Sequence, residues 1–194
     1  MFQIKRLGIR AIGLCQWFAE YGISLILWLW ADKVATHAEQ TADEGKYLVP
    51  LQRDQVLLVV LSLADGNPLT PVQVQKSLFL ADRKARGAFR GTSVYNFQPY
   101  DYGPFDRQVY VDAQTLSYRG FVEIGTDPRG GWNTYAATDE GVRAGREFMA
   151  ELAEEQRSML SRIVKIVRSL SFTELVSAIY RSYPEMRVRS VFRD

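Results

Sequence analysis

The sequence has 194 residues, of which 47% are hydrophobic and 24% charged, so it can supply the core of one ordinary globular domain. A net charge of +2 falls short of the strongly basic balance of most nucleic-acid-binding domains. One cysteine (Cys15) and one histidine (His37) exclude an internal disulfide and a multi-cysteine metal site, and leave no evident third partner for a catalytic triad. We therefore predict a cytoplasmic protein that is not an enzyme and has no metal or cofactor.

Residues 1–50 are predicted to be a separate N-terminal part, consisting of a hydrophobic helix and a polar linker. Residues 1–10 are basic and lack acids, and residues 11–31 are largely apolar. This pattern is compatible with a signal peptide or with a membrane anchor interrupted by Gln16 and Glu20. It is equally compatible with a helix that packs on the protein or a partner, or with an extension read from an upstream start codon. The last two interpretations are favoured, and contact of residues 11–31 with a membrane stays open.

Residues 51–194 are predicted to form an α+β, mostly α-helical domain. Helical spacing of Val56, Val60 and Leu63 predicts a first helix over residues 53–64, which the glycine and proline of the following turn terminate. Thr70 begins a second helix that runs to about Arg86. Its predicted core positions are Val74, Leu78 and Ala81. A helix, a short turn and a helix open a helix-turn-helix module.

The stretch 95–105 holds several aromatic residues and a Gly-Pro break, which favours an extended segment. A third helix is predicted over residues 104–118, with Phe105, Val109, Ala113 and Leu116 turned inward. Its predicted outward residues are Asp106, Arg107, Gln108, Asp112, Gln114, Thr115 and Arg119. Two strands, residues 121–124 and 132–137, then form a hairpin. Three helices followed by such a hairpin are the winged-helix arrangement.

Two further helices are predicted after the hairpin. Thr138 caps a long helix that reaches about Arg168. Its predicted buried residues are Met149, Leu152, Leu160, Ile163 and Val167. Ser171 and Glu174 form a capping box for a final helix that ends at about Tyr183. These helices are expected to fold back on each other or to join two subunits as a homodimer.

Four motifs occur in a fixed order along the chain. They are Gln73 with Leu78-Phe-Leu80, then Phe97-x-Pro-Tyr-x-Tyr-Gly-Pro-Phe105, then Leu116-x-x-x-Gly120, and finally Tyr135-x-x-Thr138-x-x-Gly141. Together they resemble the Panacea domain of SocA-like antitoxins and related YwgA-like proteins, over residues 52–185. The resemblance implies a winged-helix antitoxin that neutralises a toxin by direct contact. It also implies that segments outside the shared domain adapt such a protein to its toxin.

The aromatic stretch supplies the candidate partner-binding residues, which are Tyr100, Asp101, Tyr102 and Phe105. The rings could form a contact surface for a toxin, a peptide or stacked bases. They could instead fill the gap between the second and third helices, which is the favoured interpretation. The carboxylate between the two tyrosines would then brace the turn.

Nucleic-acid binding is the competing possibility, because the third helix occupies the position that reads the major groove in winged-helix proteins. Its outward acids offset its arginines, which argues against strong unaided binding. A more basic group surrounds the second helix: Lys76, Arg83, Lys84, Arg86 and Arg90. An ordinary solvated face is the favoured interpretation of these charges. The candidate nucleic-acid-binding residues are Arg83, Lys84, Arg107, Arg119 and Arg129.

The leading functional hypothesis is an antitoxin-like interaction protein that neutralises a cognate toxin by direct binding. The alternative is a winged-helix DNA-binding transcriptional regulator, which would act as a homodimer through its C-terminal helices. Either protein could be tethered to a membrane through residues 11–31.

Overall fold

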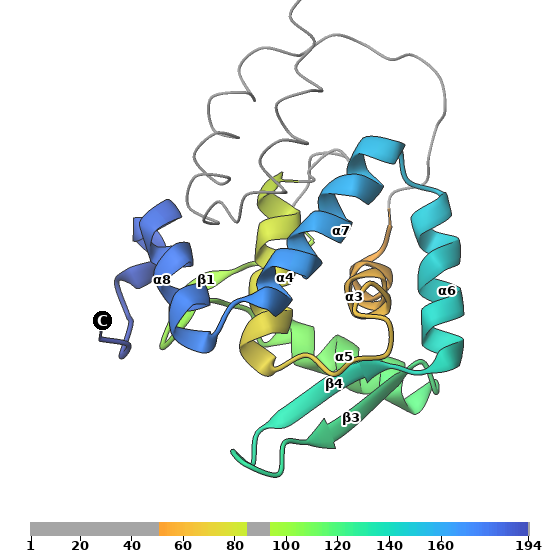
Figure 1. The fold of residues 1–194 in the computed structure, drawn as a ribbon, viewed down its shortest axis with the longest axis horizontal. Helices are drawn as coiled ribbons and strands as arrows, with labels where there is room; N and C mark the ends of the chain where they lie inside the picture. The colour runs from red at the N-terminus through yellow and green to blue at the C-terminus, as the bar shows by residue number, and fades with distance from the viewer. Residues whose placement is uncertain (1–50, 85–93, 194) are drawn as a thin grey trace, which may run out of the picture. The chain divides into compact units, whose positions relative to one another are not determined.

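The computed structural model describes residues 51–84 and 94–193, which lie in the second of the two units, Asp43–Asp194, into which the chain divides. This part of the protein is α+β and mostly helical, with two small antiparallel sheets (Figure 1). Among its helices, none has the length and apolar character needed to span a bilayer. The predictions for residues 1–50, including Cys15 and His37, lie outside the described residues.

Two hairpins divide the helices into a pair, a single helix and a final group of three, which a 3₁₀ turn follows. In chain order they are α3 (Arg53–Ser62), α4 (Pro71–Lys84), β1 (Gln98–Tyr100), β2 (Gly103–Phe105), α5 (Gln108–Tyr118), β3 (Val122–Thr126), β4 (Asn133–Ala137), α6 (Asp139–Ala150), α7 (Glu154–Ser169), α8 (Phe172–Ser182) and the 3₁₀ turn η2 (Pro184–Arg187). β1 pairs with β2, and β3 pairs with β4. A single bridge between Leu69 and Tyr135 ties the turn before α4 to β4.

Helix α3 is the centre of the core. Figure 1 shows it nearly end-on, with other helices around it, and it contacts α4, α5, α6 and β4. Every residue from Val56 to Ser62 is buried, so the helix has no solvent face along this length. The predicted core positions of α4, Val74, Leu78 and Ala81, are buried as well.

Close packing of α6 explains the Thr-x-x-Gly motif. The Thr138 hydroxyl accepts a hydrogen bond from Gly141 N at 3.1 Å and so caps the helix. A Cβ atom on Gly141 would lie 1.9 Å from the Phe121 carbonyl oxygen, and one on Gly145 would lie 2.4 Å from Ser62 Oγ. Glycine at these two positions therefore lets α6 approach β3 and α3, so this motif has a structural role here.

Two predicted helices have different limits in the structure. The third helix starts at Gln108 and not at residue 104, because Gly103–Phe105 pairs with β1 as strand β2. The long helix predicted over 138–168 is two helices, α6 and α7, separated at residues 151–153. Ala153 begins α7, where the Gln156 side chain accepts a hydrogen bond from Ala153 N at 3.1 Å. The break allows α7 to pack along α4 (Figure 1).

The final helix agrees with the prediction. Ser171 N donates to the Glu174 carboxylate at 2.9 Å, and Glu174 N donates to Ser171 Oγ at 3.3 Å. This reciprocal capping box starts α8, and Tyr183 is its last flanking residue before Pro184. α8 contacts β2 and η2, which places its first turn beside the aromatic stretch.

Candidate functional site

The aromatic stretch folds as a tight β-hairpin. Tyr100 pairs with Gly103 across the β1–β2 ladder, so Asp101 and Tyr102 form its two-residue turn. Gly103 has a φ of +97°, a conformation that L side chains rarely adopt. A Cβ atom there would also lie 3.3 Å from the Tyr180 ring and 3.6 Å from Lys76 Nζ. The glycine of the Tyr-Gly-Pro motif is therefore required both by the turn and by the side chains beneath it.

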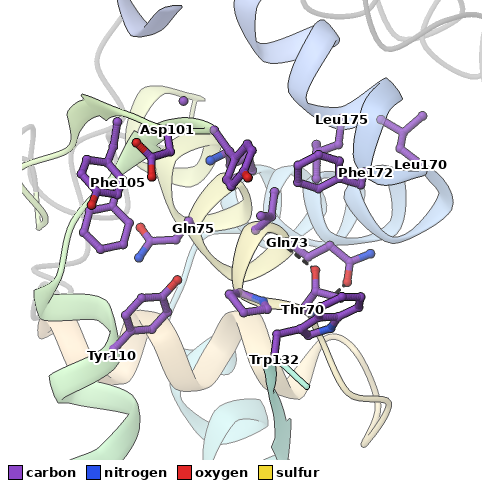
Figure 2. Close-up of a pocket in the computed structure, with 16 residues that line it drawn as sticks. Thr70, Gln73, Gln75, Asp101, Phe105, Tyr110, Trp132, Leu170, Phe172 and Leu175 are labelled. Carbon is purple, nitrogen blue, oxygen red and sulfur yellow. Dashed lines mark hydrogen bonds between the residues drawn. The ribbon is translucent and has the colours of Figure 1, made fainter. Parts of the chain in front are cut away.

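A cavity of about 680 Å³ lies beside this hairpin, which is the size of a small-molecule or peptide-anchor site (Figure 2). The hairpin and the start of α5 form one side of the cavity, with Phe105 and Tyr110 on it. The other side carries Leu170, Phe172 and Leu175 from the start of α8, and Trp132 from the loop before β4. The first turns of α4 lie between the two sides. We call this cavity the aromatic pocket.

Ring contacts organise both sides of the aromatic pocket. On one side Tyr100 stacks on Phe105 at 4.9 Å between ring centroids, and Phe105 contacts Tyr110 at 5.8 Å. Tyr102, at the hairpin turn, meets Phe172 of the other side edge to face at 5.1 Å, so the two sides are in contact there. Offset and edge-to-face contacts of this kind hold rings in fixed orientations. The pocket therefore has ordered apolar sides.

Much of this aromatic surface is open to solvent. Four aromatic side chains that line the pocket have 42–50% of their surface exposed: Tyr100, Tyr102, Trp132 and Phe172. The interpretation that Tyr100 and Tyr102 fill the core is therefore wrong, and only Phe105 is partly covered. Exposed aromatic clusters in a concave surface are typical of binding sites. All four candidate partner-binding residues, including Asp101, line the same pocket.

One charged side chain lies at the inner end of the aromatic pocket. Lys76 lines the pocket but is only 3% exposed, because the hairpin and neighbouring helices cover it. Its ammonium donates a hydrogen bond to the Pro104 carbonyl oxygen at 3.2 Å. Burial lowers the pKa of Lys76 to about 7, since desolvation penalises the charged form. The prediction that Lys76 belongs to a solvated basic face is wrong.

Most other polar groups in the pocket are already hydrogen-bonded within the protein. Gln75 donates to the Asp106 carbonyl at 2.9 Å and accepts from Asp106 N at 3.1 Å. Thr70 and Gln73 cap α4 through the two hydrogen bonds drawn in Figure 2, of 3.0 and 3.3 Å. These hydrogen bonds fix the pocket's geometry and occupy part of the hydrogen-bonding capacity of each side chain.

The C-terminal segment fastens the tip of the hairpin. The Asp101 carbonyl oxygen accepts from Val191 N at 3.0 Å and from Ser190 Oγ at 3.1 Å. Tyr180 from α8 contacts the same serine hydroxyl at 2.6 Å. Residues far apart in the sequence therefore hold the turn that carries Asp101 and Tyr102. We call this set of contacts the C-terminal clasp.

The candidate nucleic-acid-binding residues do not form one cluster of free cations. Arg119 pairs with Asp54 at 3.2 Å, and Arg129 at the β3–β4 tip pairs with Asp127 at 3.4 Å. Arg83 lies over the Phe79 ring, and Lys84 is half-buried at the end of α4. Arg107 is exposed at the start of α5. Each surface pair removes local positive charge that phosphate binding would need.

Asp112 was predicted to face solvent on the third helix, but it is only 7% exposed. Its carboxylate accepts from Arg53 Nε at 2.7 Å and from Gln108 Nε2 at 2.9 Å, and lies 3.0 Å from the Tyr95 hydroxyl. Burial, together with the nearby Asp112 charge, raises the pKa of Tyr95. This Asp112 network joins α3, the segment before β1 and α5.

Sequence reasoning missed Lys76, Trp132 and Phe172 as pocket residues. Phe172 follows the N-cap serine of α8 and Trp132 follows a glycine pair, so both looked like ordinary element boundaries. A tryptophan directly after a glycine pair in a predicted turn is the sequence signal that points to Trp132, because interfaces are enriched in tryptophan. Among the described residues, no group of three or more His, Cys, Asp or Glu side chains could hold a metal ion.

Comparison with known proteins adds no name to this site. No protein-family model matches the sequence, and no curated protein matches it either. The resemblance to the Panacea domain therefore stays a prediction from the motifs.

Proposed function

We propose that the protein is a non-enzymatic, antitoxin-like interaction protein that neutralises a cognate toxin by binding it at the aromatic pocket. The observation that carries the proposal is the aromatic pocket itself, whose four half-exposed rings come from the hairpin, the β4 loop and α8. Tyrosine and tryptophan dominate binding energy in protein interfaces, and they do so most where they surround a concave anchor site.

The internal bonding of the pocket also favours binding over chemistry. Gln75, Thr70 and Gln73 are engaged in fixing the backbone, so the pocket presents ordered apolar surface with few free polar groups. A site of this composition gains affinity by burying a partner's apolar side chain, since such burial contributes roughly 25 cal/mol per Å² of apolar area. Preformed walls add to this because little entropy is lost on binding.

The arrangement of α3, α4 and α5 followed by the β3–β4 hairpin supports a winged-helix organisation within this proposal. A winged-helix DNA-binding regulator is the alternative function. The exposed face of α5 offers little for it, because Arg107 is its one cation outside an ion pair among the outward residues, and Arg119 is paired with Asp54. DNA affinity rises with the number of phosphates neutralised, so we place the regulator second.

A growth assay tests the antitoxin function. The protein would be expressed together with the product of the gene next to its own, under conditions in which that product alone stops growth. We expect the wild type to restore growth, and Tyr102→Ala and Trp132→Ala each to reduce protection at least tenfold. Both rings are half exposed, so their loss should leave the fold intact.

Tyr118→Ala is the matched control for this assay. The Tyr118 ring is 85% exposed near the end of α5 and does not line the pocket, so its removal should leave protection unchanged. Full protection by both pocket variants would contradict binding at this site. Purified protein that binds DNA in low salt, with affinity lost in Arg107→Ala, would instead support the regulator.

A further inference from the structure

Lys76 is a second feature of the aromatic pocket, besides its half-exposed rings, that protein stability does not explain. Its ammonium can donate three hydrogen bonds, and among the described residues only the Pro104 carbonyl oxygen receives one. No carboxylate in the described part of the chain forms an ion pair with it. A buried ammonium with one hydrogen bond and no ion pair is energetically unfavourable in the unliganded protein.

The Lys76 side chain lies at the lining of the aromatic pocket. Lys76 comes from the second turn of α4 and lines the pocket together with the β1–β2 hairpin, and its Nζ lies against Gly103 and Pro104. It is the one Lys or Arg side chain among the described residues lining the pocket. A ligand that fills the apolar space therefore lies beside the one Lys or Arg side chain of the pocket's described lining.

We propose that the pocket's occupant is a segment of the partner protein that inserts an apolar side chain and, next to it, an acidic side chain whose carboxylate pairs with the Lys76 ammonium. This inference rests on the proposed function and specifies the chemistry of the partner. The apolar group lies between the ring-lined sides of the pocket, and the carboxylate accepts the hydrogen bonds that Lys76 does not donate within the protein. A charge-assisted hydrogen bond formed away from water is among the stronger polar contacts available to proteins.

The charges of the site favour a carboxylate over a phosphate group. A single ammonium balances one negative charge, whereas phosphate sites combine several donors or cations. Asp101 lines the same pocket, and its repulsion would oppose a doubly charged phosphate more strongly than a singly charged carboxylate. The pocket's lining also includes the hydroxyl groups of Tyr100, Tyr102 and Tyr110, which can donate hydrogen bonds to a carboxylate.

Two small probes test the anion site without the partner. Binding of 4-phenylbutyrate and of its uncharged analogue 4-phenylbutyramide to the full chain would be measured by calorimetry at pH 6.5. We expect the carboxylate to bind about tenfold more tightly than the amide, the order of one charge-assisted hydrogen bond. In Lys76→Met the two probes should bind equally, because the charge that distinguishes the carboxylate from the amide has been removed.

Equal binding of the two probes by the wild type, or no binding of the carboxylate at millimolar concentration, would overturn the proposal even if Lys76→Met failed to fold. A carboxylate preference that persists in a folded Lys76→Met variant would overturn it too. Competition identifies the source of the anion: 4-phenylbutyrate, but not the amide, should displace the partner from a preformed complex. A probe that binds and does not compete would overturn the assignment to the partner and indicate a free organic acid.

The same experiments separate this inference from the proposed function. If Tyr102→Ala abolishes protection in the growth assay while Lys76→Met protects fully, the pocket binds the toxin without using the charge, and the carboxylate proposal fails alone. If the probes behave as expected and no pocket variant changes protection, the anion site stands and the antitoxin function fails.

Discussion

Two of the regions in which the described part of the protein buries ionisable groups treat them differently. In the Asp112 network a carboxylate has donors from Arg53, Tyr95 and Gln108, all between 2.7 and 3.0 Å from its oxygens. At the aromatic pocket, the Lys76 ammonium has one carbonyl partner. A buried charge whose hydrogen bonds are all satisfied holds neighbouring elements together. A buried charge with few hydrogen bonds is energetically unfavourable until a ligand group of opposite charge pairs with it. The comparison supports a structural role for the first region and the proposed binding role for the second.

Removing Asp112 should give the largest loss of stability. Asp112→Ala removes the acceptor of the Arg53 guanidinium and leaves the Tyr95 hydroxyl only its longer contact of 3.2 Å with the Arg53 carbonyl oxygen, and we expect the free energy of unfolding to fall by about 3 kcal/mol. Urea denaturation measures this change. Asp112→Asn keeps one acceptor oxygen and should lose less. If Asp112→Ala is as stable as the wild type, the network is not structural and the comparison fails.

Removing the charge of Lys76 should have the opposite sign. Lys76→Met keeps the length and apolar stem of the side chain and removes a desolvated ammonium, at the expense of one hydrogen bond to Pro104. We expect the free energy of unfolding at pH 6 to rise by about 2 kcal/mol. A stabilised variant that no longer binds 4-phenylbutyrate would show that Lys76 is kept for binding. Destabilisation would show that the ammonium has a structural role after all.

The two regions should also respond to pH in opposite directions. Burial lowers the pKa of Lys76 in the folded state to about 7 from 10.5, so between these values only the unfolded chain holds the proton. Stability should therefore rise as pH increases from about 7 to 10.5. The pKa of Tyr95 is raised above 10.0, so the folded chain keeps a proton that the unfolded chain loses, and stability falls above pH 10.

Denaturation across this pH range isolates each contribution when the variants are included. The stability difference between Lys76→Met and wild type should shrink from pH 7 to pH 10.5, while Tyr95→Phe should flatten the decline above pH 10. A difference between Lys76→Met and wild type that stays constant with pH would mean that Lys76 titrates normally.

The smallest effect is expected at the surface. Arg119 pairs with Asp54, and about half of its side chain is exposed. Arg119→Ala should change the free energy of unfolding by less than about 0.5 kcal/mol, since exposed ion pairs contribute little. Its measurement provides a baseline for the two buried regions. If Arg119→Ala lowers the free energy of unfolding as much as Asp112→Ala does, burial and the number of hydrogen-bond partners do not identify the charged residues that stabilise the fold.

Local sequence signals predicted the parts of the fold that depend on neighbouring residues. The caps at Thr70, Thr138 and Ser171 are observed, because capping is decided within four residues. The helical spacing of Val74 and Leu78 correctly marked core positions. These features need no knowledge of what packs on the helix.

The errors concern residues whose surroundings come from distant segments. Lys76 lies two positions after Val74, on the side of the helix that periodicity assigns to solvent, yet the hairpin covers it. Asp112 looked outward because its partner Arg53 is 59 positions away. The aromatic motif was recognised as the candidate site, but its exposure was misjudged because Phe172 and Trp132 shape the space beside it. Pairings of this range cannot be read from a local pattern.

The C-terminal clasp bears on the kinetics of recognition. The hydrogen bond from Ser190 to Asp101 spans 89 positions, so a turn that would otherwise sample many conformations is held in one before any partner arrives. A partner that binds next to this ordered turn does not have to wait for a slow rearrangement of the turn. The association rate should then be limited by diffusion and orientation. A variant truncated before Ser190 would lack the C-terminal clasp, so the hairpin turn would be less ordered. The partner should then associate more slowly, even though every residue that lines the pocket is still present.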